Sequence, residues 1–170
     1  MTASPLYGKY RGIVTVNVDP LQIGRIQAMV PDATGFVPGT WAMPCLPMAG
    51  INSGVFTAPM IGSGVWIEFE RGDPDYPVWV GGYWGSTAEV PVLAHMVPPG
   101  VSGFTIQTPL KNGIVVSDVP GPTGGILIQT TTGAMISVSD VGIMISNGKG
   151  AVINMTGPTV DVNLGALTVV

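Results

Sequence analysis

Residues 125–170 read GILIQTTTGAMISVSDVGIMISNGKGAVINMTGPTVDVNLGALTVV, and this stretch repeats one short pattern. In each copy a glycine precedes about five residues that alternate between apolar and polar, as in strands with one buried face joined by turns. Looser copies, GFTIQT and NGIVVSD, contain Gly103 and Gly113. A short fixed period predicts stacked strands that bury their apolar faces only against neighbours. The glycines recur every 7, 8 or 9 residues, at Gly125, Gly133, Gly142, Gly150, Gly157 and Gly165.

The low charge of the chain points to an oligomer. Only 9% of the residues are charged, against roughly a quarter in ordinary globular domains, and 46% are hydrophobic. A soluble monomer normally carries more charge than this, so we expect much of the surface to be buried between subunits. The alternative, a disordered glycine-rich tail, is disfavoured because disordered segments are poor in Ile and Val.

Composition also limits the partners and the site of synthesis. The net charge of −4 and the absence of a basic cluster argue against binding to nucleic acid. Cys45 is the single cysteine, so no intrachain disulfide forms, and a reducing cytosol fits. The sequence shows neither a signal peptide core nor an apolar run long enough for a membrane helix, which predicts cytoplasmic synthesis without a signal peptide.

The chain divides into three predicted parts. Residues 1–85 carry short strand patterns without a convincing helix, and residues 86–100 look like a proline-rich linker before the repeats of residues 101–170. About five strands in about 80 residues suit a small closed barrel, which leaves no exposed sheet edge. The expected barrel strands are residues 10–18, 24–31, 55–60, 62–70 and 76–84, with a loop-rich segment from Gly35 to Gly54.

Two barrel segments carry a resemblance to a known family. Tyr10–Asp32 reads YRGIVTVNVDPLQIGRIQAMVPD, a strand, an Asp-Pro turn and a strand that returns through Gly24-Arg25. Gly62–Gly85 reads GSGVWIEFERGDPDYPVWVGGYWG, two strands joined by Gly72-Asp73-Pro74-Asp75. Together they resemble the N-terminal OB-type barrel of phage baseplate spike proteins. That family includes baseplate assembly protein V, the VgrG proteins of type VI secretion and the spikes of extracellular contractile injection systems.

The resemblance implies an all-β homotrimer with a C-terminal needle. In this family the barrels surround a threefold axis, and three C-terminal tails intertwine into a triple-stranded β-helix, a triangular β-prism. A single chain cannot close a dry core around strands of about five residues, whereas three chains can. We therefore expect the apolar set of the repeats to face the shared axis; it consists of Ile126, Ile128, Ile136, Val138, Ile143, Ile145, Ile153, Val160 and Val162.

The same resemblance implies a structural function. The chain would be the non-enzymatic central spike at the distal end of a tail tube, in a virion or an extracellular injection particle. It would plug the tube, contact baseplate hub and tube-initiator proteins, and cross the target cell membrane transiently when the sheath contracts. Two alternatives stay open: a trimeric receptor- or glycan-binding fibre, and a spike that also carries a toxin or lytic cargo.

The last residues suggest a binding surface. The chain ends in GALTVV, without charged or metal-binding side chains. Three copies of Leu167, Val169 and Val170 would form a blunt apolar platform, and exposed apolar platforms usually mark binding sites. We therefore expect a separate tip protein of the PAAR-repeat type to bind there.

No catalytic, cofactor or metal site is expected. Glu68 and Glu70, with Asp73 and Asp75 nearby, form the one carboxylate group that resembles a glycosidase pair, but solvated carboxylates on an outer strand face are commonplace. His95 is the single histidine and Cys45 has no histidine near it in the sequence. The four tryptophans, Trp41, Trp66, Trp79 and Trp84, are expected in the core or in subunit interfaces, and Gly35–Gly54 is expected to dock toward a hub.

Overall fold

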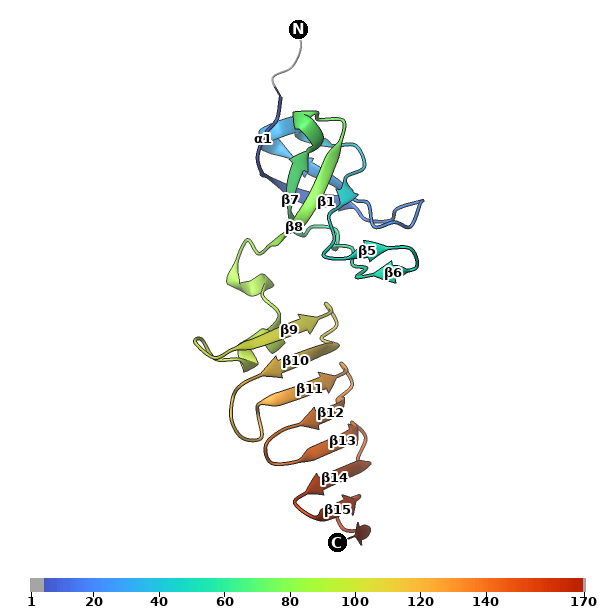
Figure 1. The fold of residues 1–170 in the computed structure, drawn as a ribbon, viewed down its shortest axis with the longest axis vertical. Helices are drawn as coiled ribbons and strands as arrows, with labels where there is room; N and C mark the ends of the chain where they lie inside the picture. The colour runs from blue at the N-terminus through green and yellow to red at the C-terminus, as the bar shows by residue number, and fades with distance from the viewer. Residues whose placement is uncertain (1–4, 170) are drawn as a thin grey trace. The chain divides into compact units, whose positions relative to one another are not determined.

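The computed structural model describes residues 5–169, and the chain is all-β (Figure 1). It divides into two compact units, Met1–Glu89 and Val90–Val170, which we call the barrel unit and the ladder unit. No helix of the described residues is long and apolar enough to cross a membrane. The all-β class predicted from the alternating patterns is therefore confirmed.

The barrel unit is built on a six-stranded sheet with the strand order β3-β2-β1-β7-β8-β4. Neighbouring strands are antiparallel, except that β4 runs parallel to β8. Ile26, just before β2, forms an isolated bridge with Ala42, just before β4, and this bridge joins the two sides of the sheet into a barrel. The strands are β1 (Tyr10–Val16), β2 (Gln27–Val30), β3 (Gly35–Pro38), β4 (Met43–Pro44), β7 (Gly64–Phe69) and β8 (Pro77–Tyr83).

The barrel core follows from strict alternation along the strands. In β7 every second side chain is buried, and these are Val65, Ile67 and Phe69. Each large apolar side chain that is fully buried contributes about 1.5–3 kcal/mol. The remaining buried members of the core cluster are Val14, Ile26, Ala28, Val30, Ala42 and Trp79.

The middle of the barrel unit differs from the sequence-based expectation. The strand expected at residues 55–60 is absent, because Pro59 has no N–H group and the Pro59 carbonyl instead accepts a hydrogen bond from Asn17 Nδ2 at 3.0 Å. The segment expected to be a loop contains β3, β4 and a small hairpin of β5 (Ala49–Gly50) and β6 (Ser53–Gly54). Short helical turns also occur: α1 (Pro31–Thr34), η1 (Glu70–Gly72) and η2 (Thr87–Glu89).

The ladder unit is one antiparallel sheet of eight strands in the order β16-β15-β14-β13-β12-β11-β10-β9. Each strand pairs with the next strand of the chain, so the backbone of this unit is hydrogen-bonded within a single copy. All eight sequence repeats are strands. They are β9 (Gly103–Gln107), β10 (Gly113–Ser117), β11 (Gly125–Gln129), β12 (Ala134–Val138), β13 (Ile143–Asn147), β14 (Val152–Thr156), β15 (Thr159–Val162) and β16 (Leu167–Val169).

A short helical segment covers part of one face of this sheet. The segment η3 (Val92–Met96) precedes β9, and its Leu93 is buried against β10. The Leu93 N–H donates to Gln107 Oε1 at 2.9 Å, and a side chain at Gly113 would meet Leu93 Cδ1 at 2.5 Å. The start of the ladder unit therefore has one face protected within the chain.

The repeated glycines serve the turns in two ways. Gly125 has a φ of 80°, which L side chains rarely adopt, and a Cβ there would lie 2.1 Å from the Val138 carbonyl oxygen. Gly133 has a similar φ of 86°, but its hypothetical Cβ would meet only Gly148 Cα at an ordinary 3.7 Å. Some repeat glycines therefore allow close approach of the backbone as well as an unusual turn.

This contrast gives the first prediction. Gly133→Ala should lower ladder stability by about 1 kcal/mol, the cost of the left-handed conformation, whereas Gly125→Ala should cost at least about 2 kcal/mol because the backbone must also shift. Urea unfolding followed by far-UV circular dichroism would measure both. Equal decreases in the free energy of unfolding of the two variants would show that the close approach at Gly125 does not contribute to stability.

Candidate functional site

The most extensive feature is one apolar face of the ladder unit. Directly opposite residues of antiparallel strands share a face, so the strand register identifies which side chains lie together. From β9 to β16 the register links two parallel rows of eight positions, and every position holds an apolar residue. One row is Phe104, Val116, Ile126, Val138, Ile143, Met155, Val160 and Val169; the other is Ile106, Ile114, Ile128, Ile136, Ile145, Ile153, Val162 and Leu167.

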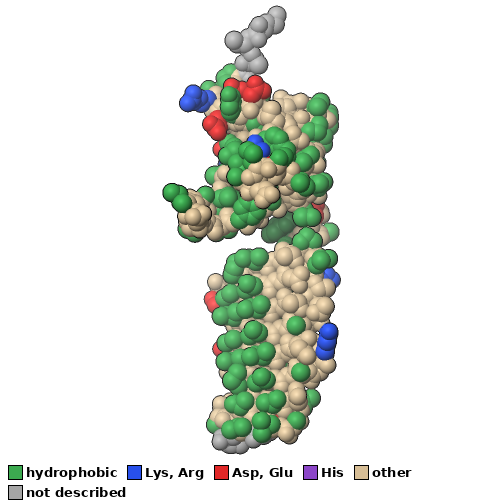
Figure 2. Space-filling model, turned by 90° about the vertical axis from the view of Figure 1, so that its right-hand side faces the viewer, with side chains coloured by type: hydrophobic (Ala, Val, Ile, Leu, Met, Phe, Trp, Pro, Cys, Tyr) green, Lys and Arg blue, Asp and Glu red, His purple; other side chains and the backbone are tan. Residues whose placement is uncertain are grey.

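These rows are uncovered in the single chain. Ile126 and Ile128 are 43% and 44% exposed, and Ile136 is 40% exposed. Figure 2 shows hydrophobic side chains gathered in bands along the ladder unit. The residues that alternate with these two rows along the strands lie on the opposite face of the sheet. That face holds both polar and apolar side chains and includes Ser137 and Asn154. We call the two apolar rows the ladder face. An exposed apolar surface of this length is typical of a protein interface.

The residues expected in a trimer core all lie on the ladder face. All nine residues predicted from the repeats, from Ile126 to Val162, belong to one or the other row. Leu167 and Val169, expected to bind a tip protein, continue the rows on β16 and are 58% and 56% exposed. The third residue of that expectation, Val170, lies outside the described residues.

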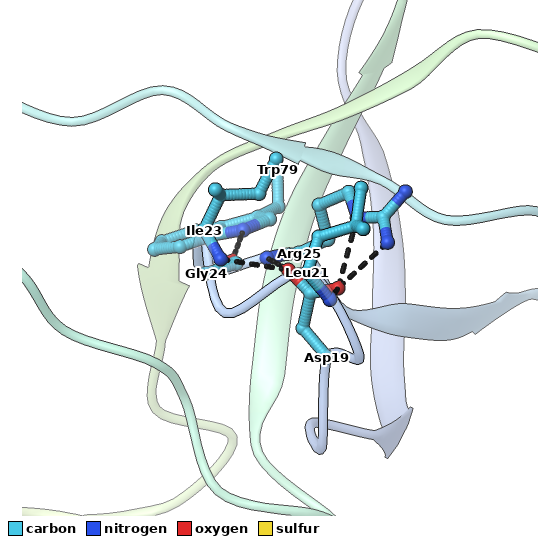
Figure 3. A network of polar contacts seen from close by, with 6 residues as sticks. All are labelled: Asp19, Leu21, Ile23, Gly24, Arg25 and Trp79. Carbon is cyan, nitrogen blue, oxygen red and sulfur yellow. Dashed lines mark hydrogen bonds and ion pairs between the residues drawn. The ribbon is translucent and has the colours of Figure 1, made fainter.

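A polar network organises the turn between β1 and β2 in the barrel unit (Figure 3). Asp19 is buried, and its carboxylate accepts hydrogen bonds from the backbone N–H groups of Leu21, Ile23 and Arg25 at 3.0–3.2 Å. The Arg25 guanidinium donates to Asp19 Oδ1 from Nε at 3.0 Å and from Nη2 at 2.7 Å. The Gly24 carbonyl accepts a hydrogen bond from Trp79 Nε1 at 3.0 Å, which ties this turn to the core.

The network fixes the protonation state of Asp19. The Arg25 guanidinium holds the pKa of the Asp19 carboxyl well below its usual range; the backbone donors act in the same direction, and burial opposes them. Arg25 also lies over the Trp41 ring, 5.1 Å from its centroid. The Asp19 carboxylate accepts all of these hydrogen bonds from groups of its own turn, so its role is to stabilise the turn. The sequence contains the Asp-Pro and Gly-Arg signals, but no local pattern assigns the five donors to one side chain.

The second family-like segment forms a strained turn between β7 and β8. Arg71 and Gly72 have φ values of 55° and 78°. The Asp73 carboxylate accepts the Asp75 N–H at 3.0 Å, and the Gly72 carbonyl accepts the Leu6 N–H at 2.8 Å. A Cβ on Gly72 would lie 2.8 Å from Pro5 Cβ. These hydrogen bonds hold the turn between β7 and β8 in shape, so the second segment, like the first, has a structural role.

The candidate catalytic groups do not converge. Glu68 lies on β7 and pairs with Lys9 at 2.5 Å, whereas Glu70 follows the end of β7 and starts η1, so the two are not on one strand face as the alternation predicted. His95 and Cys45 are exposed in different units. Among residues 5–169 no group of three His, Cys, Asp or Glu side chains is placed to hold a metal ion.

The tryptophans occupy different environments. Trp79 is buried in the core, and Trp66 is half-buried against Tyr83 with ring centroids 5.1 Å apart. Arg11 lies over both of these rings, 5.4 Å and 5.2 Å from their centroids. Trp84 is 62% exposed, and it borders a surface cavity described below.

Comparison with known protein families agrees with this architecture. Residues 10–84 match the type VI secretion system/phage-baseplate injector OB domain, and residues 103–168 match the phage baseplate V C-terminal trimerisation domain. No curated protein has a significant match to the chain. The two matched domains cover most of the barrel unit and the strand ladder up to residue 168, and the trimerisation domain implies that the protein is a trimer. The chain therefore belongs to the phage baseplate V family of baseplate spike proteins.

Proposed function

We propose that this chain is the trimeric central spike of a contractile injection machine, and that its ladder units form the needle. The observation that carries the proposal is the ladder face, with sixteen apolar positions in two rows and no polar interruption. Three such sheets around an axis bury one another's apolar rows, which a single sheet leaves in water. The result is a triangular β-prism.

Such a prism is suited to mechanical work. Strands about 4.8 Å apart give eight layers a length on the order of 40 Å. The backbone is hydrogen-bonded along the shaft in each copy, and the apolar rows lock the three copies together. Bending or unfolding one layer would disturb pairing and packing at the same time, so force applied at one end is transmitted to the other.

In the particle the barrel units would plug the distal end of the tail tube and contact the hub and tube-initiator proteins. Sheath contraction would then drive the needle through the target cell membrane. No bond is made or broken in this function, and wall-cutting activity is assigned to no residue of the chain.

The proposal is tested by locating the chain in assembled particles and by measuring its mass. Native mass spectrometry should give three copies, and an N-terminal tag visualised by electron microscopy should lie at the distal end of the tube. Particles assembled without the chain should fail to permeabilise target membranes. A monomeric mass, or label along the side of the particle, would contradict the proposal.

We further propose that the end of the needle binds a separate tip protein. Leu167 and Val169 are exposed on β16, the outermost strand of the sheet, whose outer edge has no strand neighbour within the described chain. Deleting Leu167–Val170 should abolish capture of a PAAR-repeat tip protein in a pull-down, while native mass spectrometry still shows three copies. Unchanged capture would assign tip binding to another surface.

A further inference from the structure

An apolar arm extends from the barrel unit. It consists of residues 48–56 and contains the β5–β6 hairpin, with Ile51 and Asn52 at its tip. Ile51 is 95% exposed, the highest value among the large apolar residues of the described chain, and Phe56 is 68% exposed. Met48 and Val55 on the arm are 56% and 49% exposed. The arm therefore presents apolar side chains along its length.

The arm lacks the features of a free loop. Its strands have only two residues each, and the Val55 N–H donates to the Met48 carbonyl at 3.0 Å. An isolated two-stranded hairpin is at best marginally stable in water, so this one needs a packing partner. Residues 33–67 contain no charged side chain, although surface loops are usually polar. These properties indicate that the arm is an interface element.

The charges of the barrel unit lie elsewhere. Five of its charged residues fall in the segment 68–75, from the end of β7 to the turn before β8, and Lys9 pairs with one of them, Glu68. Asp19 and Arg25 form an ion pair with each other. The barrel unit thus has a charged, solvated turn and an uncharged arm. The exposed apolar side chains of the arm are the ones that an interface would bury.

The same chain carries a cavity suited to such an arm. A surface cavity of about 620 Å³ lies beside the ends of β7 and β8, and its lining includes Ile61, Gly62, Gly64, Tyr83, Trp84 and Glu89. Glu89 is the single charged lining residue, and its carboxylate already accepts the Gly85 N–H at 2.9 Å. Glycine backbone and aromatic rings make a wall for an uncharged, apolar tip.

The cavity is located at the root of the arm. Pro59 lines it, and the hydrogen bond from Asn17 Nδ2 fixes the Pro59 carbonyl to the end of β1. The Tyr83 ring covers the position where a Cβ on Gly64 would lie and packs on Trp66, which holds the aromatic wall in place. Each copy therefore carries a projecting tip at one end of this segment and a receiving surface at the other.

We propose that the arm tip of each copy, Ile51–Asn52, inserts into this cavity on the next copy of the chain. A tip and a receptor on one subunit make a head-to-tail contact, and three such contacts close into a ring under threefold symmetry. The inference rests on the trimer of the proposed function. There the ladder units hold the barrel units at millimolar effective concentration, so a neighbouring copy is the partner that the arm meets first.

Cysteine cross-linking tests this contact. In a Cys45→Ser background, Ile51→Cys places a thiol on the arm tip and Ser63→Cys places one in the cavity lining. Mild oxidation of the double variant should give a covalent trimer on a non-reducing gel, because each copy supplies both halves of the contact. Each single variant should run as a monomer. A control pair, Ile51→Cys with Asp75→Cys in the charged turn, should also give no trimer.

The outcomes separate this inference from the proposed function. Covalent dimers from Ile51→Cys alone would mean that the arms meet one another at the axis, and the cavity contact would be wrong. Absence of cross-linking in a protein that native mass spectrometry shows to be trimeric would also overturn it and would assign the arm to a baseplate protein. A monomeric native mass would overturn the proposed function as well.

Discussion

The Ile136→Asp protein should fail to assemble as a trimer. Ile136 lies in the middle of the ladder face, between Ile128 and Ile145 in its row, and three copies would place three carboxylates in an apolar core. An uncompensated buried charge costs about 3–5 kcal/mol, and three in one layer also repel one another. Native mass spectrometry and light scattering should show monomers or aggregates in place of the trimer.

Ser137→Asp provides the matched control. Ser137 is the next residue of β12, and its side chain lies on the opposite, mixed face. The substitution introduces the same charge into the same strand, so any effect of strand propensity is common to both variants. The Ser137→Asp protein should remain trimeric. Trimers in both variants would show that the ladder face is not the subunit interface.

The second large effect is expected in the barrel unit. Asp19→Asn removes the charge that faces Arg25 and replaces one acceptor oxygen by an NH₂ group, which opposes the N–H donors around it. The midpoint of thermal unfolding of the barrel should fall by more than about 5 °C. All four tryptophans lie in residues 1–89, so tryptophan fluorescence follows this unit separately from the ladder.

The same residue predicts a dependence on pH. The pKa of Asp19 is lowered in the folded state, so its contribution to stability is complete above the ordinary carboxyl pKa of about 3.9 and is lost as the pH falls further toward the folded value. The barrel of the parent protein should therefore lose stability below about pH 4, and the Asp19→Asn barrel should lose less.

Asp32→Asn is the control for this prediction. Asp32 is exposed in α1, so its replacement should leave the unfolding midpoint at neutral pH close to that of the parent. A parent and an Asp19→Asn protein that unfold identically between pH 3 and pH 7 would contradict the structural role of the network.

The sequence alone determined the ladder. Alternation and the glycine period are local signals, since each repeat carries its own turn and its own apolar pair, and eight repeats became eight strands. Period-two alternation also assigns the predicted residues to one face, because adjacent strands of a short-turn meander keep opposite residues on the same side. The family resemblance rested on two local segments for the same reason.

Only the tertiary structure decided how the barrel closes and what its polar residues do. The Ile26–Ala42 bridge and the Trp79–Gly24 hydrogen bond join segments that no local pattern connects. The strand expected at residues 55–60 is absent for a related reason, because the Pro59 carbonyl accepts a hydrogen bond from Asn17, which is distant in the sequence. Local periodicity determines a structure whose contacts are between sequence neighbours, whereas a barrel is determined by long-range contacts.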